Sequence, residues 1–285
     1  MRAESRFFTP PIFMKGMIGM DWKKIMSEDA VPLETLKEDG GFCGIFRTIG
    51  FVGDSLSSGE FESFDENENR NYHDMFDYSW GQYIARAIGS KAYNFSRGGM
   101  TAEEYCEGFA DNNRMWDSAK ACQAYVIALG VNDISKNGSN LGDLSDIDLE
   151  DYKNNKKTFV GYYAQIIQRY KKIQPRAKFF LMTIPHDGRK DKERTEAEEL
   201  HAALIYKLAE TFSNTYVLDF RKYAPEYDKE FYDAFMLGGH MNPMGYMLTA
   251  KMVMSYIDFI IRHNPKDFKE VPFIGTDLKN LSENK

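Results

Sequence analysis

Residues 46–60, FRTIGFVGDSLSSGE, join a short apolar run to a glycine and a polar turn. The run 46–52 has the length and composition of a buried strand, and Gly53 ends it. Ser55 therefore falls just beyond the end of a predicted strand. A serine in a turn is ordinarily structural, because serines are common in turns and at helix N-caps. Whether Ser55 has a functional role depends on which residues lie at the ends of the other strands.

The rest of the chain alternates between apolar runs and amphipathic segments. We expect further strands over 92–95, 124–130, 177–184 and 215–220. We expect helices over 78–89, 101–110, 158–174, 196–213 and 243–263. Strands that alternate with long helices predict a parallel sheet with helices on both faces, a three-layer α/β/α sandwich. Ligands bind such sheets at the carboxyl ends of the strands.

One domain accounts for most of the chain. We place it at residues 46–265, between an N-terminal accessory or capping segment (1–45) and a C-terminal tail (266–285). The segment 1–45 mixes proline, glycine and charge without a clear period, and its role is left open. Residues 60–77 are dense in Asp, Glu and Asn, which favours a polar loop over a packed element. Glu60, Tyr78 and Trp80 are near enough to Ser55 in sequence to help shape a pocket.

Composition excludes several classes of protein. The formal net charge of −7 over 285 residues argues against nucleic-acid binding, which usually needs a basic face. The three cysteines lack a CxxC spacing, so neither a disulfide framework nor a zinc site is implied. The N-terminus has two prolines and no continuous apolar region, so we expect no signal peptide, and no segment approaches the roughly 20 uninterrupted apolar residues of a membrane span. We expect a cytoplasmic protein without a membrane partner, and the sequence leaves its oligomeric state open.

Polar motifs lie at four of the predicted strand ends or in the loops beyond them. Besides Ser55, these are NFSRGGMT (94–101), LGVNDIS (129–135) and GGHMNPMGY (238–246). A serine hydroxyl is a weak nucleophile that needs an adjacent imidazole to take its proton. A carbonyl under attack develops negative charge, which preorganised N–H donors must meet. A serine, a glycine, an asparagine and a histidine at one sheet edge are therefore chemically consistent.

Together these motifs resemble the four blocks of SGNH hydrolases, the GDSL-type esterase and lipase family. The letters GDSL at 53–56 match the first block, and the other three blocks supply Gly99, Asn132 and His240. The match extends from residue 51 to 246, and it implies a flavodoxin-like fold that hydrolyses acyl esters. It further implies that Ser55 is the nucleophile and His240 the base. The Ser55 and Gly99 N–H groups and the Asn132 amide would form the oxyanion hole, without a metal or cofactor.

One position departs from the family pattern. SGNH hydrolases usually carry an aspartate three residues before the histidine, and here that position is Leu237. The acid normally orients the imidazole and stabilises its charged form. Three readings stay open: a Ser–His dyad with a backbone carbonyl as the orienting group, Asp233 in place of the missing acid, or reduced activity.

The resemblance implies small-molecule or oligosaccharide esters as substrates, and we expect short acyl groups, acetyl above all, on a carbohydrate. The alternatives are an acyltransferase, a lysophospholipase or thioesterase, and a non-catalytic carbohydrate-binding relative. Other enzyme templates are missing from the chain. It contains no G-x-G, no Gly-Lys dipeptide and no G-x-S-x-G, so dinucleotide, Walker and α/β-hydrolase motifs are absent.

Overall fold

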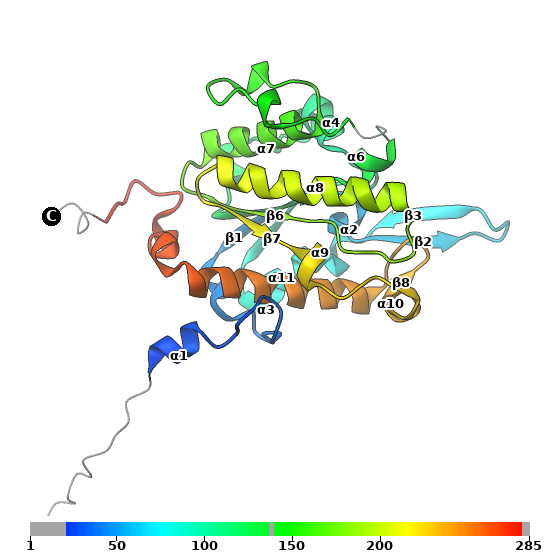
Figure 1. Cartoon of the computed structure of the whole chain (residues 1–285), viewed down its shortest axis with the longest axis horizontal. Helices are drawn as coiled ribbons and strands as arrows, with labels where there is room; N and C mark the ends of the chain where they lie inside the picture. The colour runs from blue at the N-terminus through cyan, green and yellow to red at the C-terminus, as the bar shows by residue number, and fades with distance from the viewer. Residues whose placement is uncertain (1–20, 137–139, 281–285) are drawn as a thin grey trace, which may run out of the picture.

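A computed structural model describes residues 21–136 and 140–280 (Figure 1). Residues 1–20 of the predicted accessory segment and 281–285 of the predicted tail lie outside that part. Within it, a parallel sheet of five strands has the order β4-β1-β5-β6-β7. The strands are β1 (Thr48–Gly53), β4 (Lys91–Ser96), β5 (Ala124–Ala128), β6 (Lys178–Met182) and β7 (Thr215–Leu218). Along the chain this is the flavodoxin-like order 2-1-3-4-5, which confirms the predicted fold class.

Helices cover both faces of the sheet, as Figure 1 shows. The long ones are α3 (Trp80–Ile88), α7 (Phe159–Ile173), α8 (Lys192–Thr211) and α11 (Pro243–His263). The short ones are α1 (Trp22–Met26), α2 (Ser55–Ser58), α4 (Ala102–Glu104), α5 (Ala110–Asn112), α6 (Val131–Lys136), α9 (Phe220–Tyr223) and α10 (Lys229–Phe235). Two small antiparallel hairpins complete the fold: β2 (Glu60–Phe64) with β3 (Arg70–Asp74), and β8 (Met236–Leu237) with β9 (His240–Met241).

Two hydrophobic cores flank the sheet, and the strands supply them by alternation. Phe51 and Val126 face the core that contains α3 and α11. Their neighbours Val52 and Ile127 face the core that contains α7 and α8. Successive side chains of a strand point to opposite faces, so a continuous apolar run fills both cores at once. This is why the strands could be recognised in the sequence as apolar stretches.

The long helices lie close to their predicted ranges. Helix α11 begins at Pro243, with Asn242 as its N-cap, and ends at His263, as predicted. Helix α8 begins a turn earlier than predicted, because the Asp191 side chain caps it by accepting the Arg194 N–H. Among the described residues, α11 alone is long and apolar enough to cross a membrane by length and composition. Most of its apolar stretch is buried, as in a core helix.

The segment 60–77 differs from the prediction of a polar loop. It forms the β2–β3 hairpin, followed by a short 3₁₀ turn at Phe76–Tyr78. Asp65 builds the hairpin turn by accepting the N–H groups of Asn67 and Asn69. Phe61 packs against Tyr246 of α11 with 5.4 Å between ring centroids, so one face of the hairpin is anchored to the domain. In Figure 1 the hairpin projects from the end of the sheet where β8 and α10 lie.

A buried ion cluster joins the described part of the N-terminal segment to the domain. Arg262 of α11 donates to Asp258 at 2.8 Å, and it also pairs with Asp29. The Arg262 side chain is 1% exposed. At the other end of the chain, Phe268, Val271 and Ile274 contribute to the same core as α11.

We predict that Arg262→Ala destabilises the protein by about 3–5 kcal/mol, because it removes the buried cation shared by two buried carboxylates, of which Asp29 keeps Lys37 at 3.8 Å. Lys251→Ala is the matched control, since Lys251 pairs with the exposed Glu38 and such pairs contribute about 1 kcal/mol or less. Urea unfolding of both variants measures the two costs. Equal costs for the two substitutions would contradict a structural role for the buried cluster.

Candidate active site

The sheet topology brings three of the predicted site loops together. Gly53, the last residue of β1, pairs with Ser96 of β4 on one side and with Ala128 of β5 on the other. Strands β1 and β5 are the pair at which the strand order reverses, the place where open α/β sheets bind ligands. Ser55 follows β1, Gly99 follows β4 and Asn132 follows β5, so all three lie at this switch point.

Ser55 is the first residue of helix α2, and the residues around it fix its backbone. Asp54 caps the helix by accepting the Leu56 N–H at 3.1 Å. Gly53 has no space for a side chain, because an added Cβ would overlap Oγ of Ser57. Among the described residues, the Ser55 N–H has no hydrogen-bond acceptor. A free N–H at the start of a helix is suited to stabilise an anionic oxygen.

Gly99 and Asn132 stand on the two sides of this turn. Gly99 has a φ of 69°, a left-handed conformation that favours glycine. Its N–H, like that of Ser55, has no acceptor within the described residues. Asn132 is in α6, and its side-chain Nδ2 donates to Asp54 Oδ2 at 3.2 Å. The amide has a second N–H, which leaves one donor available for a ligand.

His240 is the first residue of β9, and its ring is held by a carboxylate. The Nδ1–H donates to Glu62 Oε1 at 2.8 Å, and the Gly239 N–H donates to the same oxygen at 2.8 Å. The other Glu62 oxygen lies 3.3 Å from Nε of Arg70, an ion-pair contact without hydrogen-bond alignment. The ring of Tyr72 meets the imidazole edge to face at 6.0 Å. Glu62 therefore fixes both the orientation and the tautomer of His240.

Electrostatics keep Glu62 ionised. Burial raises the pKa of this carboxyl, since the side chain is 3% exposed. The hydrogen bonds from His240 and Gly239 and the charge of Arg70 lower it by more, so that the net pKa lies below the ordinary 4.5. An ionised carboxylate is the group that stabilises an imidazolium when the histidine takes a proton.

The predicted candidates for orienting His240 were therefore wrong. Asp233 points away on α10 and pairs with Lys229 at 2.5 Å, with a side chain that is 66% exposed. No backbone carbonyl accepts from Nδ1 among the described residues, because that nitrogen is bonded to Glu62. Leu237, which replaces the family aspartate, is 51% exposed on β8. The acid comes instead from the hairpin that was predicted to be a loop.

The second nitrogen of His240 faces another carboxylate. Oε1 of Glu60 lies 3.1 Å from Nε2, and the Glu60 side chain is 13% exposed. Burial raises the pKa of Glu60, and the nearby Asp74 and Glu62 raise it further, while His240 opposes them. Helix α2, which begins at Ser55, contacts both β2 and β9, the strand that begins at His240. Within the described residues, however, no hydrogen bond joins Ser55 to His240.

Two buried aspartates lie beside these groups. Burial raises the pKa of Asp54 to about 6 and that of Asp133 to about 7. Asp133 accepts the Ala102 N–H at 2.9 Å through Oδ1, whereas its Oδ2 has no partner. Both carboxyls lie next to the residues expected to bind an oxyanion.

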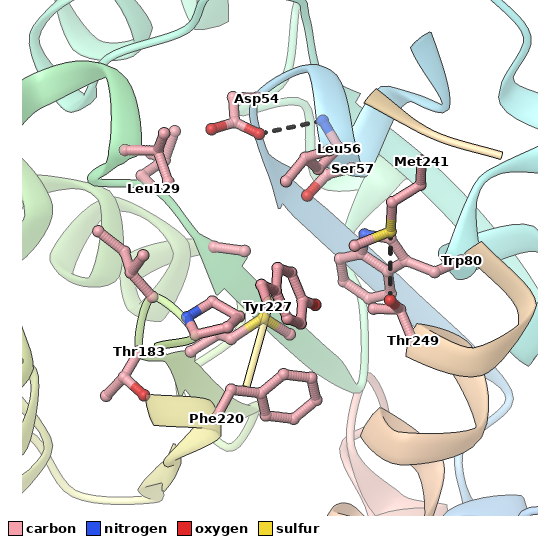
Figure 2. A pocket seen from close by; sticks show the side chains of 15 residues that line it. Asp54, Leu56, Ser57, Trp80, Leu129, Thr183, Phe220, Tyr227, Met241 and Thr249 are labelled. Atoms are coloured by element: carbon pink, nitrogen blue, oxygen red, sulfur yellow. Dashed lines mark hydrogen bonds between the residues drawn. The ribbon is translucent and has the colours of Figure 1, made fainter. Parts of the chain in front are cut away.

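An apolar cavity of about 60 Å³ adjoins α2 (Figure 2). Its walls include Leu56 and Trp80, and Met182, Phe220 and Met241 complete its apolar side. Neither Ser55 nor His240 lines it, but Asp54 and Leu56, the neighbours of Ser55, both do. The buried hydroxyl of Ser57, which has no hydrogen-bond partner, points towards it. Trp80 also packs on Phe51 of β1, so it has a structural role as well.

The structure is a flavodoxin-like α/β/α sandwich with a serine directly after β1, at the switch point of the sheet. A model of the GDSL-like lipase/acylhydrolase family matches residues 51–248. The chain belongs to this family. A comparison with curated protein sequences finds no match.

Solved structures with the same fold include two carbohydrate esterases of family two. One, from Clostridium thermocellum in complex with cellohexaose, is 16% identical, with a TM-score of 0.53 over 78% of this chain and 65% of that chain. The other, from Corynascus thermopiles (Myceliophthora fergusii), carries a carbohydrate-binding domain. It is 16% identical, with a TM-score of 0.51 over 82% of this chain and 69% of that chain. This chain thus spans about two thirds of the length of each.

We predict that Asp133→Asn makes the protein less sensitive to alkaline pH. The pKa of Asp133 is higher in the folded state (about 7) than its ordinary 3.8. The folded state therefore binds more protons between about pH 4 and 7, so stability falls as the pH rises through that range. The free energy of unfolding should be measured for both proteins at pH 5 and pH 8. Between these two values the wild type should lose a few kcal/mol more stability than the variant. Parallel pH curves for the two proteins would contradict this assignment.

Proposed function

We propose that this protein is a serine esterase that hydrolyses short acyl esters, with acetyl groups on carbohydrates as the expected substrates. Ser55 is the nucleophile, His240 is the general base and acid, and Glu62 is the positioning residue that holds His240. The Ser55 and Gly99 N–H groups and the Asn132 amide receive the oxyanion. The observation that carries the proposal is the Glu62–His240 hydrogen bond at the end of the switch-point strands.

The reaction follows from these positions. Ser55 Oγ attacks the ester carbonyl carbon while its proton moves to His240 Nε2, and the carbonyl oxygen becomes an anion held by the three donors. The tetrahedral intermediate collapses, the bond to the alcohol oxygen breaks, and His240 returns the proton to that oxygen. Water then attacks the acyl-enzyme and gives a proton to His240. That proton passes to Ser55 Oγ as the acid leaves.

Glu62 removes the main argument for a non-catalytic relative. That alternative depended on Leu237 in place of the family aspartate, which left His240 without an acid. Glu62 supplies an ionised carboxylate at 2.8 Å from Nδ1, in a buried position where it stabilises the imidazolium strongly. A protein that needed His240 only for binding would have no need for this arrangement.

The substrate proposal has two supports. The cavity of about 60 Å³ beside Ser55 is much smaller than the ~150 Å³ cavity that holds a benzene molecule, which favours an acyl group of a few carbons. The Clostridium thermocellum esterase of the same fold was solved with cellohexaose, which makes a carbohydrate a reasonable alcohol.

We predict that Ser55→Ala lowers kcat on an acetylated sugar and on p-nitrophenyl acetate by on the order of 10⁶, because the nucleophile is lost. Ser63→Ala is the control, since Ser63 is exposed in the same region and its hydroxyl is hydrogen-bonded to His73. A fluorophosphonate probe should label the wild type and the control but not Ser55→Ala. Aryl esters of increasing acyl length should show kcat/KM falling beyond about four carbons. Full turnover by Ser55→Ala would contradict the proposed nucleophile.

We predict that Glu62→Gln lowers kcat by about 10³–10⁴ while KM changes little, because a neutral amide does not stabilise the imidazolium. Glu66→Gln, on the exposed turn of the same hairpin, is the matched control and should behave as the wild type. A structural effect alone would lower the unfolding midpoint and raise KM. Equal kcat values for Glu62→Gln and Glu66→Gln would show that Glu62 does not support His240.

A further inference from the structure

Glu60 occupies the space between the proposed base and the proposed oxyanion loop. Its Oε1 is 3.1 Å from His240 Nε2. Its Oε2 lies so close to Gly98 that a Cβ added there would overlap it. Gly98 directly precedes Gly99, whose N–H is a proposed oxyanion donor. One carboxylate thus spans from the nitrogen that must take the Ser55 proton to the loop that must bind the ester oxygen.

This position is incompatible with the first step of the reaction. Nε2 must offer a lone pair to Ser55, and Oε1 of Glu60 lies 3.1 Å from that nitrogen. A hydroxyl cannot approach Nε2 from the side that the Glu60 carboxylate occupies. Oε2 of Glu60 also lies against Gly98, the residue before the proposed oxyanion donor Gly99.

The contacts of Glu60 are weaker than those of Glu62. Glu62 accepts two aligned hydrogen bonds and is 3% exposed. Glu60 is at ion-pair distance from Nε2 without hydrogen-bond alignment, and it is 13% exposed. The neighbouring carboxylates of Asp74 and Glu62 repel it. Glu60 is therefore the carboxylate that a substrate can displace.

The backbone of Glu60 is fixed by hydrogen bonds, so only its side chain has to move when a substrate displaces it. The Tyr246 hydroxyl donates to the Glu60 carbonyl oxygen at 2.7 Å. The preceding Gly59 is held by the Met75 N–H, which donates to its carbonyl oxygen at 3.0 Å. Rotation of the side chain about its own bonds can clear the site without moving the hairpin that carries Glu62.

We infer that Glu60 is a built-in carboxylate ligand that occupies the space between His240 Nε2 and the Gly98–Gly99 loop in the resting protein and leaves when an ester binds. The inference rests on the proposed function, because the site it blocks is the proposed Ser55–His240 centre. It predicts that the space freed by removing Glu60 binds a small free carboxylate, the chemical class of the product acid.

The test compares Glu60→Ala, Glu60→Gln and the control Glu66→Ala with the wild type. The measurements are kcat/KM on p-nitrophenyl acetate, the rate of labelling by a fluorophosphonate, and the inhibition constant of acetate. If Glu60 blocks the site for about nine-tenths of the time, its removal raises kcat/KM and the labelling rate about tenfold. The inhibition constant of acetate should fall by the same factor, and Glu66→Ala should match the wild type.

Two results would overturn the inference. Lower labelling and lower kcat/KM in a folded Glu60→Ala variant would mean that Glu60 takes part in the reaction. Unchanged values would mean that Glu60 does not block the site. Glu60→Gln keeps the size of the side chain without its charge and should show a smaller increase. If Glu60→Ala does not fold, the comparison of Glu60→Gln with the wild type tests the inference instead.

Failure of the proposed function can be told apart from failure of this inference. If neither the wild type nor Glu60→Ala turns over esters or reacts with the probe, the esterase proposal alone is refuted. Acetate binding is then followed by the ¹⁵N signals of the His240 ring in a Ser55→Ala background, which needs no turnover. Acetate should shift these signals when Glu60 is also replaced by alanine, and much less when it is present. Equal shifts in both would refute the inference.

Discussion

The hydrogen bond from His240 Nδ1 to Glu62 Oε1 joins two segments that are 178 residues apart in the chain. It holds the β2–β3 hairpin against the β8–β9 hairpin and sets the plane of the imidazole between them. Because Nδ1 donates to the ionised Glu62, the other nitrogen, Nε2, is the one left to take a proton, and it faces Glu60. The orientation of the base, and with it the chemistry proposed for Ser55, depends on this one contact.

The sheet makes that contact useful by fixing the other groups independently. Gly53 sits between Ser96 and Ala128 in the parallel register, so the loops with Ser55, Gly99 and Asn132 emerge side by side. These positions could be predicted from the sequence, because the strands are continuous apolar runs with polar motifs directly after them. Period-two alternation explains why the runs were clear: each strand has a core on both faces and tolerates few polar residues.

The hairpin could not be predicted in the same way, because its stability comes from a few anchors. Phe61 is its main contribution to the core, while Glu60, Glu62 and Arg70 give the segment the polarity of a loop. The sequence does carry a signal in hindsight: Glu and Phe alternate over EFE (60–62), ahead of a turn rich in Asp and Asn. The partner of His240 was missed for a different reason. An acid close to the histidine in sequence can be recognised as a motif, whereas one supplied from another element is fixed only by tertiary structure.

Because the orienting acid, Glu62, lies on a strand and not in a loop, its neighbours have a fixed geometry. Side chains two residues apart on a strand point to the same face and are separated by about 6.6 Å along it. Glu60 and Glu62 therefore both face His240, at a spacing comparable to an imidazole with one oxygen on each side. The residue that orients Nδ1 thus brings a second carboxylate to Nε2, unless the residue two places before it is small or apolar. The two-residue period of β2 therefore places Glu62 where it supports His240 and, by the same spacing, places Glu60 at the reactive Nε2.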